Sequence, residues 1–264
     1  MTKPASTTHI DGVSGVRHLL LPWLTDKTVP VGRVDMVALV LFDFDGPMCN
    51  LFHRHDPAAV RAAVFEALNA DGAVPKRLRR ERNAHRLLRG MWQLGSGQVE
   101  HANKDLTDQE SFAAVSALPT PRARELMEML AASDVTMAIT SNNSAVAIRA
   151  YLERNGLAGF FGERIYARGD DPGLMKPSAH TLTTAVAGLE PEGETVLLGD
   201  SPSDAEAAWR ADVGFIGCVH PADLGWRRTA QRWRDVARLR WAGADVVVRD
   251  LGAVIAAFAD RANV

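Results

Sequence analysis

The chain has 264 residues, of which 47% are apolar and 23% charged, and its net charge is −2. Such values are ordinary for a globular protein, and a charge near zero gives no general attraction to nucleic acid or anionic membranes. Two cysteines are too few for a disulfide framework, and no apolar run approaches the ~20 residues of a membrane helix. We therefore expect a cytoplasmic protein with neither a membrane nor a nucleic acid as partner.

The polar residues 1–35 are expected to form a loosely structured leader, with one short helix around Val16–Leu24. Beyond the leader, short runs of apolar and β-branched residues predict strands. These runs are Val37–Asp43, Val135–Thr140, Arg164–Ala167, Thr195–Gly199, Gly214–Val219 and Ala244–Val248. Because their apolar character is continuous rather than alternating, the strands are predicted to be covered on both faces, as in a parallel sheet.

Segments with apolar residues three and four positions apart lie between most of these runs and predict helices. They are Pro121–Ala132, Asn143–Asn155, Ser178–Leu189, Ser203–Ala211 and Asp250–Asp260. Ser203 followed by Glu206 fits a capping box at the start of the fourth helix. The alternation of strand and helix predicts an α/β fold with a doubly wound, mostly parallel sheet of the Rossmann type.

The stretch between Asn50 and Leu118 interrupts this alternation, because only helical patterns occur in it. The patterns span Pro57–Ala70, Lys76–Leu94 and Gln109–Ala117. We interpret residues 51–117 as an all-helical cap domain inserted after the first strand. Residues 36–50 and 118–264 are then the α/β core.

Two helical segments are rich in arginine, Lys76–Arg89 and Trp226–Trp241. In the second, tryptophans recur after seven and eight residues, at 226, 233 and 241, which predicts a buried stripe with the arginines outside. We interpret both segments as solvated helix faces, with binding of an acidic substrate or partner as the alternative.

Polar residues that could carry chemistry follow the predicted strands. Asp43 and Asp45 are two positions apart, so in extended backbone both side chains project to the same side. The ends of later strands supply Ser141, Asn142, Lys176, Asp200 and Asp204. Ligands of open α/β sheets bind at the carboxyl ends of the strands. Carboxylates at this density suit Mg²⁺, whereas the lysine and the small hydrogen-bond donors suit a phosphate.

The order of the motifs DFDG, TSN, KP and GDSPSD resembles the haloacid dehalogenase-like (HAD) superfamily of phosphatases. The helical insert resembles the C1-type cap of its phosphoglycolate phosphatase and β-phosphoglucomutase-like members. The resemblance covers about residues 37–250. It implies a Mg²⁺-dependent phosphomonoesterase that hydrolyses a small phosphorylated metabolite through an aspartyl-phosphate intermediate.

The resemblance also implies a role for each motif residue. Asp43 would be the nucleophile, and Asp45 the general acid and then the general base. Ser141, Asn142 and Lys176 would bind the phosphoryl group. The Mg²⁺ ligands would be Asp43, the carbonyl of Asp45, and Asp200, with Asp204 as a further ligand or a support.

Two other functions remain open at this point. A β-phosphoglucomutase-like phosphomutase shares every core residue, and a non-catalytic HAD-like protein would use its basic helices to bind an acidic partner. His53, Arg54 and His55 lie where the chain enters the cap and are candidates for substrate specificity. The chain is expected to be a monomer or a homodimer, and the sequence does not choose between them.

Overall fold

The computed structural model describes residues 36–70, 72–219 and 227–259, and in the helix at 227–241 it describes side chains from residue 234 onward. The expected leader and its short helix at Val16–Leu24 lie outside the described residues.

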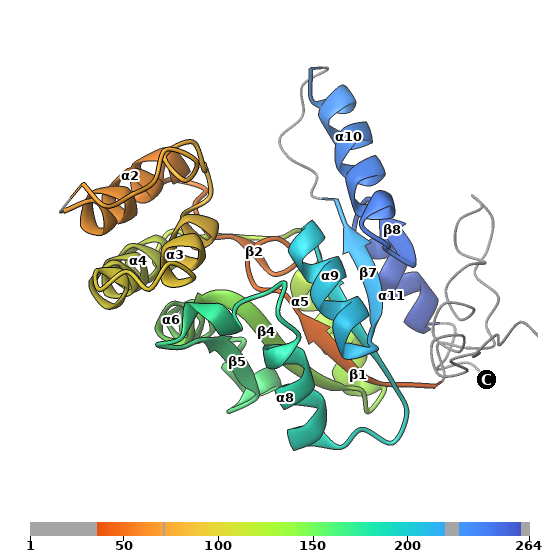
Figure 1. Ribbon diagram of the computed structural model, residues 1–264. Helices are drawn as coiled ribbons and strands as arrows, with labels where there is room; N and C mark the ends of the chain where they lie inside the picture. The colour runs from red at the N-terminus through yellow and green to blue at the C-terminus, as the bar shows by residue number, and fades with distance from the viewer. Residues whose placement is uncertain (1–35, 71, 220–226, 260–264) are drawn as a thin grey trace, which may run out of the picture.

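Six parallel strands form the central sheet in the order β5-β4-β1-β6-β7-β8 (Figure 1). Their bounds are β1 Val37–Phe42, β4 Thr136–Ser144, β5 Ile165–Arg168, β6 Glu194–Gly199, β7 Gly214–Cys218 and β8 Val246–Val248. The chain starts in the middle, adds β4 and β5 on one side, and then returns to add β6, β7 and β8 on the other. The predicted doubly wound α/β fold is confirmed, and β1 lies where the winding direction changes, which is where such sheets bind ligands.

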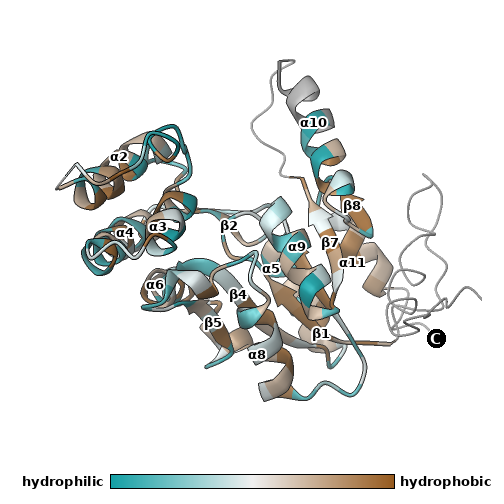
Figure 2. Cartoon of the chain, in the orientation of Figure 1, coloured by the Kyte–Doolittle hydropathy of each residue, from teal (hydrophilic) through white to brown (hydrophobic). Residues whose placement is uncertain are grey.

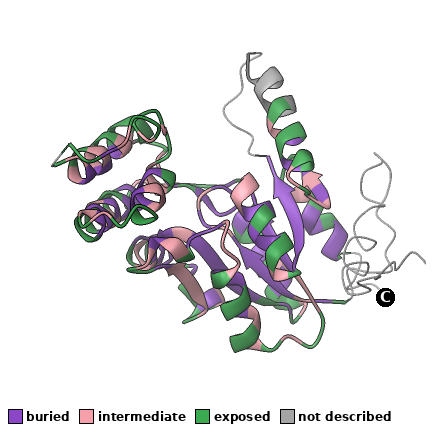
Figure 3. Cartoon of the chain, in the orientation of Figure 1, coloured by how far each residue is buried: buried purple, intermediate pink, exposed green. Residues whose placement is uncertain are grey.

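Helices cover both faces of this sheet (Figure 1). They are α5 Ala123–Ala132, α6 Ala145–Arg154, α7 Ala158–Phe161, α8 His180–Leu189, α9 Pro202–Ala211, α10 Arg227–Trp241 and α11 Gly252–Ala259, with the short 3-10 helix η3 at Pro172–Leu174. Figures 2 and 3 show apolar, buried strands between helices whose outer surfaces are exposed.

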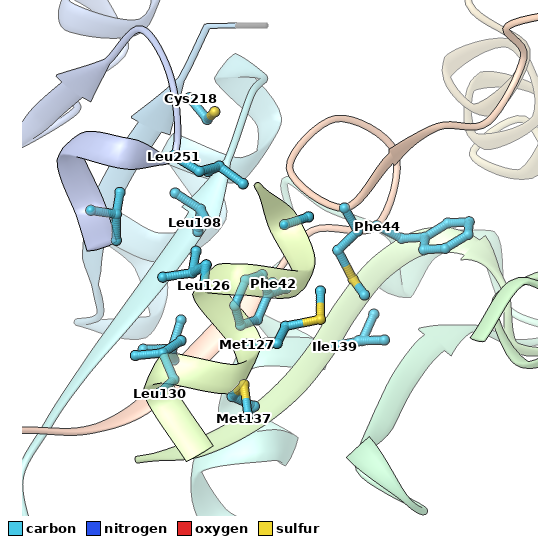
Figure 4. Close-up of a cluster of buried hydrophobic side chains, with 14 of the residues drawn as sticks. Phe42, Phe44, Leu126, Met127, Leu130, Met137, Ile139, Leu198, Cys218 and Leu251 are labelled. Atoms are coloured by element: carbon cyan, nitrogen blue, oxygen red, sulfur yellow. The ribbon is translucent and has the colours of Figure 1, made fainter. Parts of the chain in front are cut away.

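The continuous apolar run of β1 is explained by two hydrophobic clusters, one on each face of the sheet. Val40 and Phe42 belong to the cluster that includes α5, whereas Leu39 and Leu41 belong to the cluster that includes α8 and α9. Figure 4 shows Phe42 among side chains of α5. Burying one such side chain contributes about 1.5–3 kcal/mol, so alternate residues of β1 anchor opposite layers.

The helices α2 Pro57–Leu68, α3 Ala84–Trp92 and α4 Val99–Ala114 stand apart from the sheet and have an apolar cluster of their own (Figure 1). We call residues 51–117 the helical insert. Two short antiparallel strands, β2 Cys49–Asn50 and β3 Leu118–Pro119, join where the chain leaves and re-enters the core. The sequence did not predict this pair, because two residues are too few to show a periodicity.

Two predicted helix starts in the insert and one predicted capping box are wrong. The helix predicted over Lys76–Leu94 begins only at Ala84, where the side chain of Asn83 accepts a hydrogen bond from the backbone N–H of Arg86. The helix predicted to start at Gln109 begins at Val99. The capping box of α9 is formed by Ser201 with Asp204, two residues before the predicted pair.

The stripe of tryptophans predicted on α10 is also wrong at Trp241, whose exposed fraction is 94%. Among the side chains of this helix that the structure describes, Val236 and Leu239 are buried, and they pack in the cluster with β7 residue Phe215. Trp226 and the side chain of Trp233 lie outside what the structure describes.

Candidate active site

The end of β1 places two carboxylates on one side of the chain. Phe44 between them is fully buried and packs edge-to-face on Tyr151, with 5.3 Å between ring centroids. Asp43 and Asp45 consequently point the other way and line a cavity of about 290 Å³. The two-residue alternation expected from the sequence thus brings both groups to the same cavity.

Gly46 allows the chain to turn beside Asp200. Its φ is +129°, and a Cβ at this position would lie 2.6 Å from the Cγ of Asp200. Any larger residue would push the Asp200 side chain away from Asp43. The Gly46 carbonyl accepts a 2.7 Å hydrogen bond from the Thr120 hydroxyl, which fixes the turn to the chain that returns from the helical insert.

Lys176 is almost wholly buried against the same carboxylates. Its Nζ donates to Asp43 Oδ1 and to the Thr140 carbonyl, both at 2.9 Å, and lies 2.5 Å from Asp204 Oδ1. Burial alone lowers the pKa of the ammonium, but the carboxylates of Asp204 and Asp43 overcome this and raise it above its ordinary value. Lys176 is therefore a permanent cation at neutral pH.

We call five residues the strand-end cluster: Asp43, Asp45, Asp200, Asp204 and Lys176. Carboxylate oxygens of Asp43, Asp200 and Asp204 all lie within 4.8 Å of one another. Burial raises the pKa of both Asp43 and Asp200, and repulsion from Asp204 raises each further. Four carboxylates face one lysine, so the cluster has the excess negative charge that a cation would neutralise.

Asp45 differs from its neighbours in its hydrogen bonding. Its Oδ1 accepts a 2.9 Å bond from the backbone N–H of Leu51. Burial raises its pKa to about 7, and this hydrogen bond limits the rise. The group can therefore exist in either protonation state near neutral pH.

Asn142 lines the cavity, but Ser141 does not. The side chain of Asn142 donates to the carbonyl of Lys176 (3.0 Å) and accepts from its N–H (2.7 Å), so it fixes the loop that carries the lysine. The Ser141 hydroxyl is buried and donates to Asn143 Oδ1 at 3.1 Å. Sequence reasoning placed both at the cavity, and the structure brings only one of them there.

His53, Arg54 and His55 do not line the cavity either. The Nε2 of His55 is 3.0 Å from the hydroxyl of Ser116, and its ring packs edge-on against Phe112, so it joins the first and last parts of the insert. The insert instead reaches the cavity through α3 and its cap, with Asn83, His85, Arg86 and Arg89.

Those four residues lie in or beside the arginine-rich segment 76–89, which the sequence analysis interpreted as a solvated face. Arg86 and Arg89, and also Arg238 of α10, line the cavity, which favours the alternative that these segments bind an acidic substrate; Arg86 and Arg238 are nevertheless exposed to solvent. Helical spacing identifies the polar face of a helix, but it does not reveal whether solvent or a binding site lies in front of that face.

A second ionic cluster, which sequence reasoning missed, joins the insert to the core. Glu110 of α4 is fully buried and accepts hydrogen bonds from Arg168, His85, Asn143 and the backbone N–H of Ser144. We call Glu110, Arg168, His85 and Asn143 the Glu110 cluster. Glu110 lies four residues after the buried Leu106 and three before the buried Ala113, and this position on an apolar stripe was the available signal.

The Glu110 cluster has matched charges. Burial alone raises the pKa of Glu110, but Arg168 and then His85 outweigh it and bring the pKa down to about 2. Arg168 also donates to Asn103, Thr107 and the carbonyl of Asn142. One cluster thus links α3 and α4 with β4 and β5, and it holds His85 at the cavity.

The family model of the haloacid dehalogenase-like hydrolases matches residues 37–212, so the chain belongs to this family and is a hydrolase. The predicted superfamily and the prediction of an enzyme are confirmed. No curated protein matches the chain. In the part of the chain that the structure describes, no helix combines the length and apolar character that crossing a bilayer requires.

Several solved structures share the fold. A predicted phosphatase from Clostridium acetobutylicum has a TM-score of 0.59 at 16% identity, over 84% of this chain and 97% of that one. A hydrolase from Pseudomonas syringae has a TM-score of 0.57 at 21% identity, over 83% and 98%. A HAD family hydrolase from Deinococcus radiodurans, with bound phosphate and sodium, has a TM-score of 0.54 at 22% identity, over 86% and 97%.

Proposed function

We propose that the protein is a Mg²⁺-dependent phosphomonoesterase that acts on a small phosphorylated metabolite through an aspartyl-phosphate on Asp43. The observation that carries the proposal is the gathering of Asp43, Asp45, Asp200 and Lys176 at one cavity. The names of solved structures with this fold support it, since one is a predicted phosphatase and another holds phosphate.

The strand-end cluster fits a magnesium ion. The carboxylate oxygens of Asp43, Asp200 and Asp204 are hard ligands within 4.8 Å of one another, and the absence of a side chain at Gly46 lets Asp200 approach the others. Asp43, Asp200 and the backbone carbonyl of Asp45 would hold the ion, with Asp204 supporting Lys176 beside it. Bound there, Mg²⁺ would offset the negative charge of the phosphoryl oxygens and of the carboxylates.

In this proposal the hydrolysis of the phosphomonoester takes two steps, in which Asp43, Asp45 and Lys176 each have a role. A carboxylate oxygen of Asp43 attacks phosphorus while the bond to the leaving oxygen breaks, and Asp45 gives that oxygen its proton. Asp45 then takes a proton from a water molecule that attacks the aspartyl-phosphate, which releases phosphate and restores Asp43. Lys176, 2.9 Å from Asp43, holds the nucleophile in position and offsets charge on the phosphoryl group.

The helical insert would act as the cap over this reaction. In this proposal residues 51–117 are the cap domain, and residues 36–50 with 118–264 are the core. The insert closes one side of the cavity with α3, which supports a role in excluding water and selecting the substrate.

The test is release of inorganic phosphate from p-nitrophenyl phosphate and from a panel of phosphorylated metabolites, with and without Mg²⁺. The wild type should release phosphate only with the metal, and Asp43→Asn should abolish turnover. Asp108→Asn, an exposed aspartate of α4, is the matched control and should keep full activity. After acid quenching, mass spectrometry should find phosphate on the peptide that contains Asp43.

Full activity of Asp43→Asn would refute the proposal. Isomerisation of a sugar phosphate without release of phosphate would favour the phosphomutase alternative. Absence of any turnover in the wild type would favour a non-catalytic, partner-binding protein.

A further inference from the structure

The cavity of the proposed active site carries two regions of opposite charge. One is the strand-end cluster, with its excess of carboxylates. The other consists of three arginines, Arg86 and Arg89 of α3 and Arg238 of α10, which all line the same cavity. In Figure 1 these two helices lie on different sides of the molecule, so separate elements of the fold contribute arginines to one cavity.

None of these three arginines has a carboxylate partner within ion-pair distance among the described residues, whereas Arg122, Arg149, Arg168 and Arg210 each contact a carboxylate. Arg89 is only partly exposed, and its Nε is buried without a hydrogen-bond partner. Packing holds this side chain at the cavity without a polar partner, and such a guanidinium gains free energy when an anion binds.

The other residues that line the cavity limit which kinds of ligand it can bind. Among the described residues that line the cavity there is no Phe, Tyr or Trp side chain on which a nucleobase or an aryl group could stack. Asn83 and His85 add hydrogen-bonding groups beside the arginines. A volume of about 290 Å³ is at the lower end of ligand cavities, which run from roughly 300 to 1,000 Å³. The cavity therefore suits a small, polar and anionic molecule.

We propose that the substrate is a small phosphomonoester with a second anionic group, a carboxylate or a phosphate, and that Arg86, Arg89 and Arg238 bind this second group. The inference rests on the proposed phosphomonoesterase. Lys176 already serves the phosphoryl group that is transferred, and it is engaged with Asp43 and Asp204. Guanidinium groups bind carboxylate and phosphate through paired hydrogen bonds, which suits them to recognise the far end of such a substrate.

The test compares substrates that differ in the second charge. For a carboxylate the pair is 3-phosphoglycerate and glycerol 3-phosphate, and for a phosphate it is fructose 1,6-bisphosphate and fructose 6-phosphate. The wild type should prefer the doubly anionic member of at least one pair by about tenfold or more in kcat/KM. The pair with the larger preference identifies the second group.

Arg86→Gln, Arg89→Gln and Arg238→Gln should each lower that preference by about tenfold, because a charged hydrogen bond is lost. Arg80→Gln, an exposed arginine of the insert outside the cavity, should leave both activity and preference unchanged. Arg86 and Arg238 are exposed, so their variants should fold, and thermal unfolding of each variant checks this.

Equal loss of activity on both members of a pair would show that the arginines bind the transferred phosphate, and it would overturn the inference. A wild type without preference in either pair, or variants that keep the preference, would overturn it as well. A wild type that hydrolyses p-nitrophenyl phosphate but prefers the esters without a second anionic group leaves the phosphomonoesterase intact and refutes only the second anionic group. A protein inactive on every ester refutes the proposed function, and the inference with it.

Discussion

The molecule contains two buried ionic clusters, and they differ in charge balance. In the Glu110 cluster a single carboxylate is surrounded by Arg168, His85 and amide donors, and its pKa falls to about 2. In the strand-end cluster four carboxylates share one lysine, and the pKa values of Asp43 and Asp200 rise. Glu110 is fully buried, whereas Asp43, Asp45 and Asp200 are half-buried, so greater burial of Glu110 cannot explain why its pKa is the one that falls.

The difference indicates what each cluster is for. A charge whose partners are all supplied by the chain stabilises the fold and needs nothing else. A cluster with excess charge costs folding free energy, and it is expected where a ligand supplies the missing charge. The Glu110 cluster thus fixes the helical insert on the core, and the strand-end cluster is where the proposed function places a cation and a phosphate.

The largest expected effect comes from breaking the balanced cluster. Glu110→Gln keeps the shape of the side chain but leaves Arg168 buried beside an amide, so the free energy of unfolding should fall by about 3–5 kcal/mol. Urea unfolding measures this, with Glu66→Gln on the exposed side of α2 as a control that should change it by less than about 0.5 kcal/mol. If Glu110→Gln changes the free energy of unfolding only slightly, the Glu110 cluster does not stabilise the fold, and the proposed contrast with the strand-end cluster is wrong.

The difference in free energy of unfolding between the wild type and Glu110→Gln should depend on pH. The pKa of Glu110 is lower in the folded state, about 2 against an ordinary 4.5, so its charge stabilises the protein fully above 4.5 and progressively less as the pH falls toward 2. This shift corresponds to about 3 kcal/mol. The gap between wild type and Glu110→Gln in urea unfolding should therefore shrink from about pH 5 to about pH 3, and a constant gap would contradict the lowered pKa.

The strand-end cluster, unlike the Glu110 cluster, should make the free energy of unfolding depend on Mg²⁺. Mg²⁺ at about one hundred times its Kd should raise the free energy of unfolding of the wild type by about 2.7 kcal/mol, and a chelator should reverse the effect. Asp200→Asn removes one of the mutually repelling carboxyl groups, so the metal-free protein should become more stable while losing its response to Mg²⁺. If Asp200→Asn instead destabilises the metal-free protein, the cluster is structural like the other.

Local patterns predicted much of the fold and part of the site. The continuous apolar runs predicted each strand of the large sheet, because a strand covered on both faces leaves a signal within its own residues. Asp43 and Asp45 could be placed on one side for the same local reason. Helix starts were less predictable. Asn83 and Ser201 act as caps because their side chains accept hydrogen bonds from backbone N–H groups in the first helical turn, which have no partner within the helix.

The sequence by itself determined the α/β fold, the family and the carboxylates that follow β1 and β6, since each is written in short stretches of neighbouring residues. Only the tertiary structure decided that Arg86, Arg89 and Arg238 face the cavity, that Ser141 and His53–His55 do not, and that Glu110 has Arg168 as its partner. Arg168 and Glu110 are 58 residues apart in the chain. The physical reason is that charge pairing and exposure depend on which segments pack together, and that packing is a property of the whole chain.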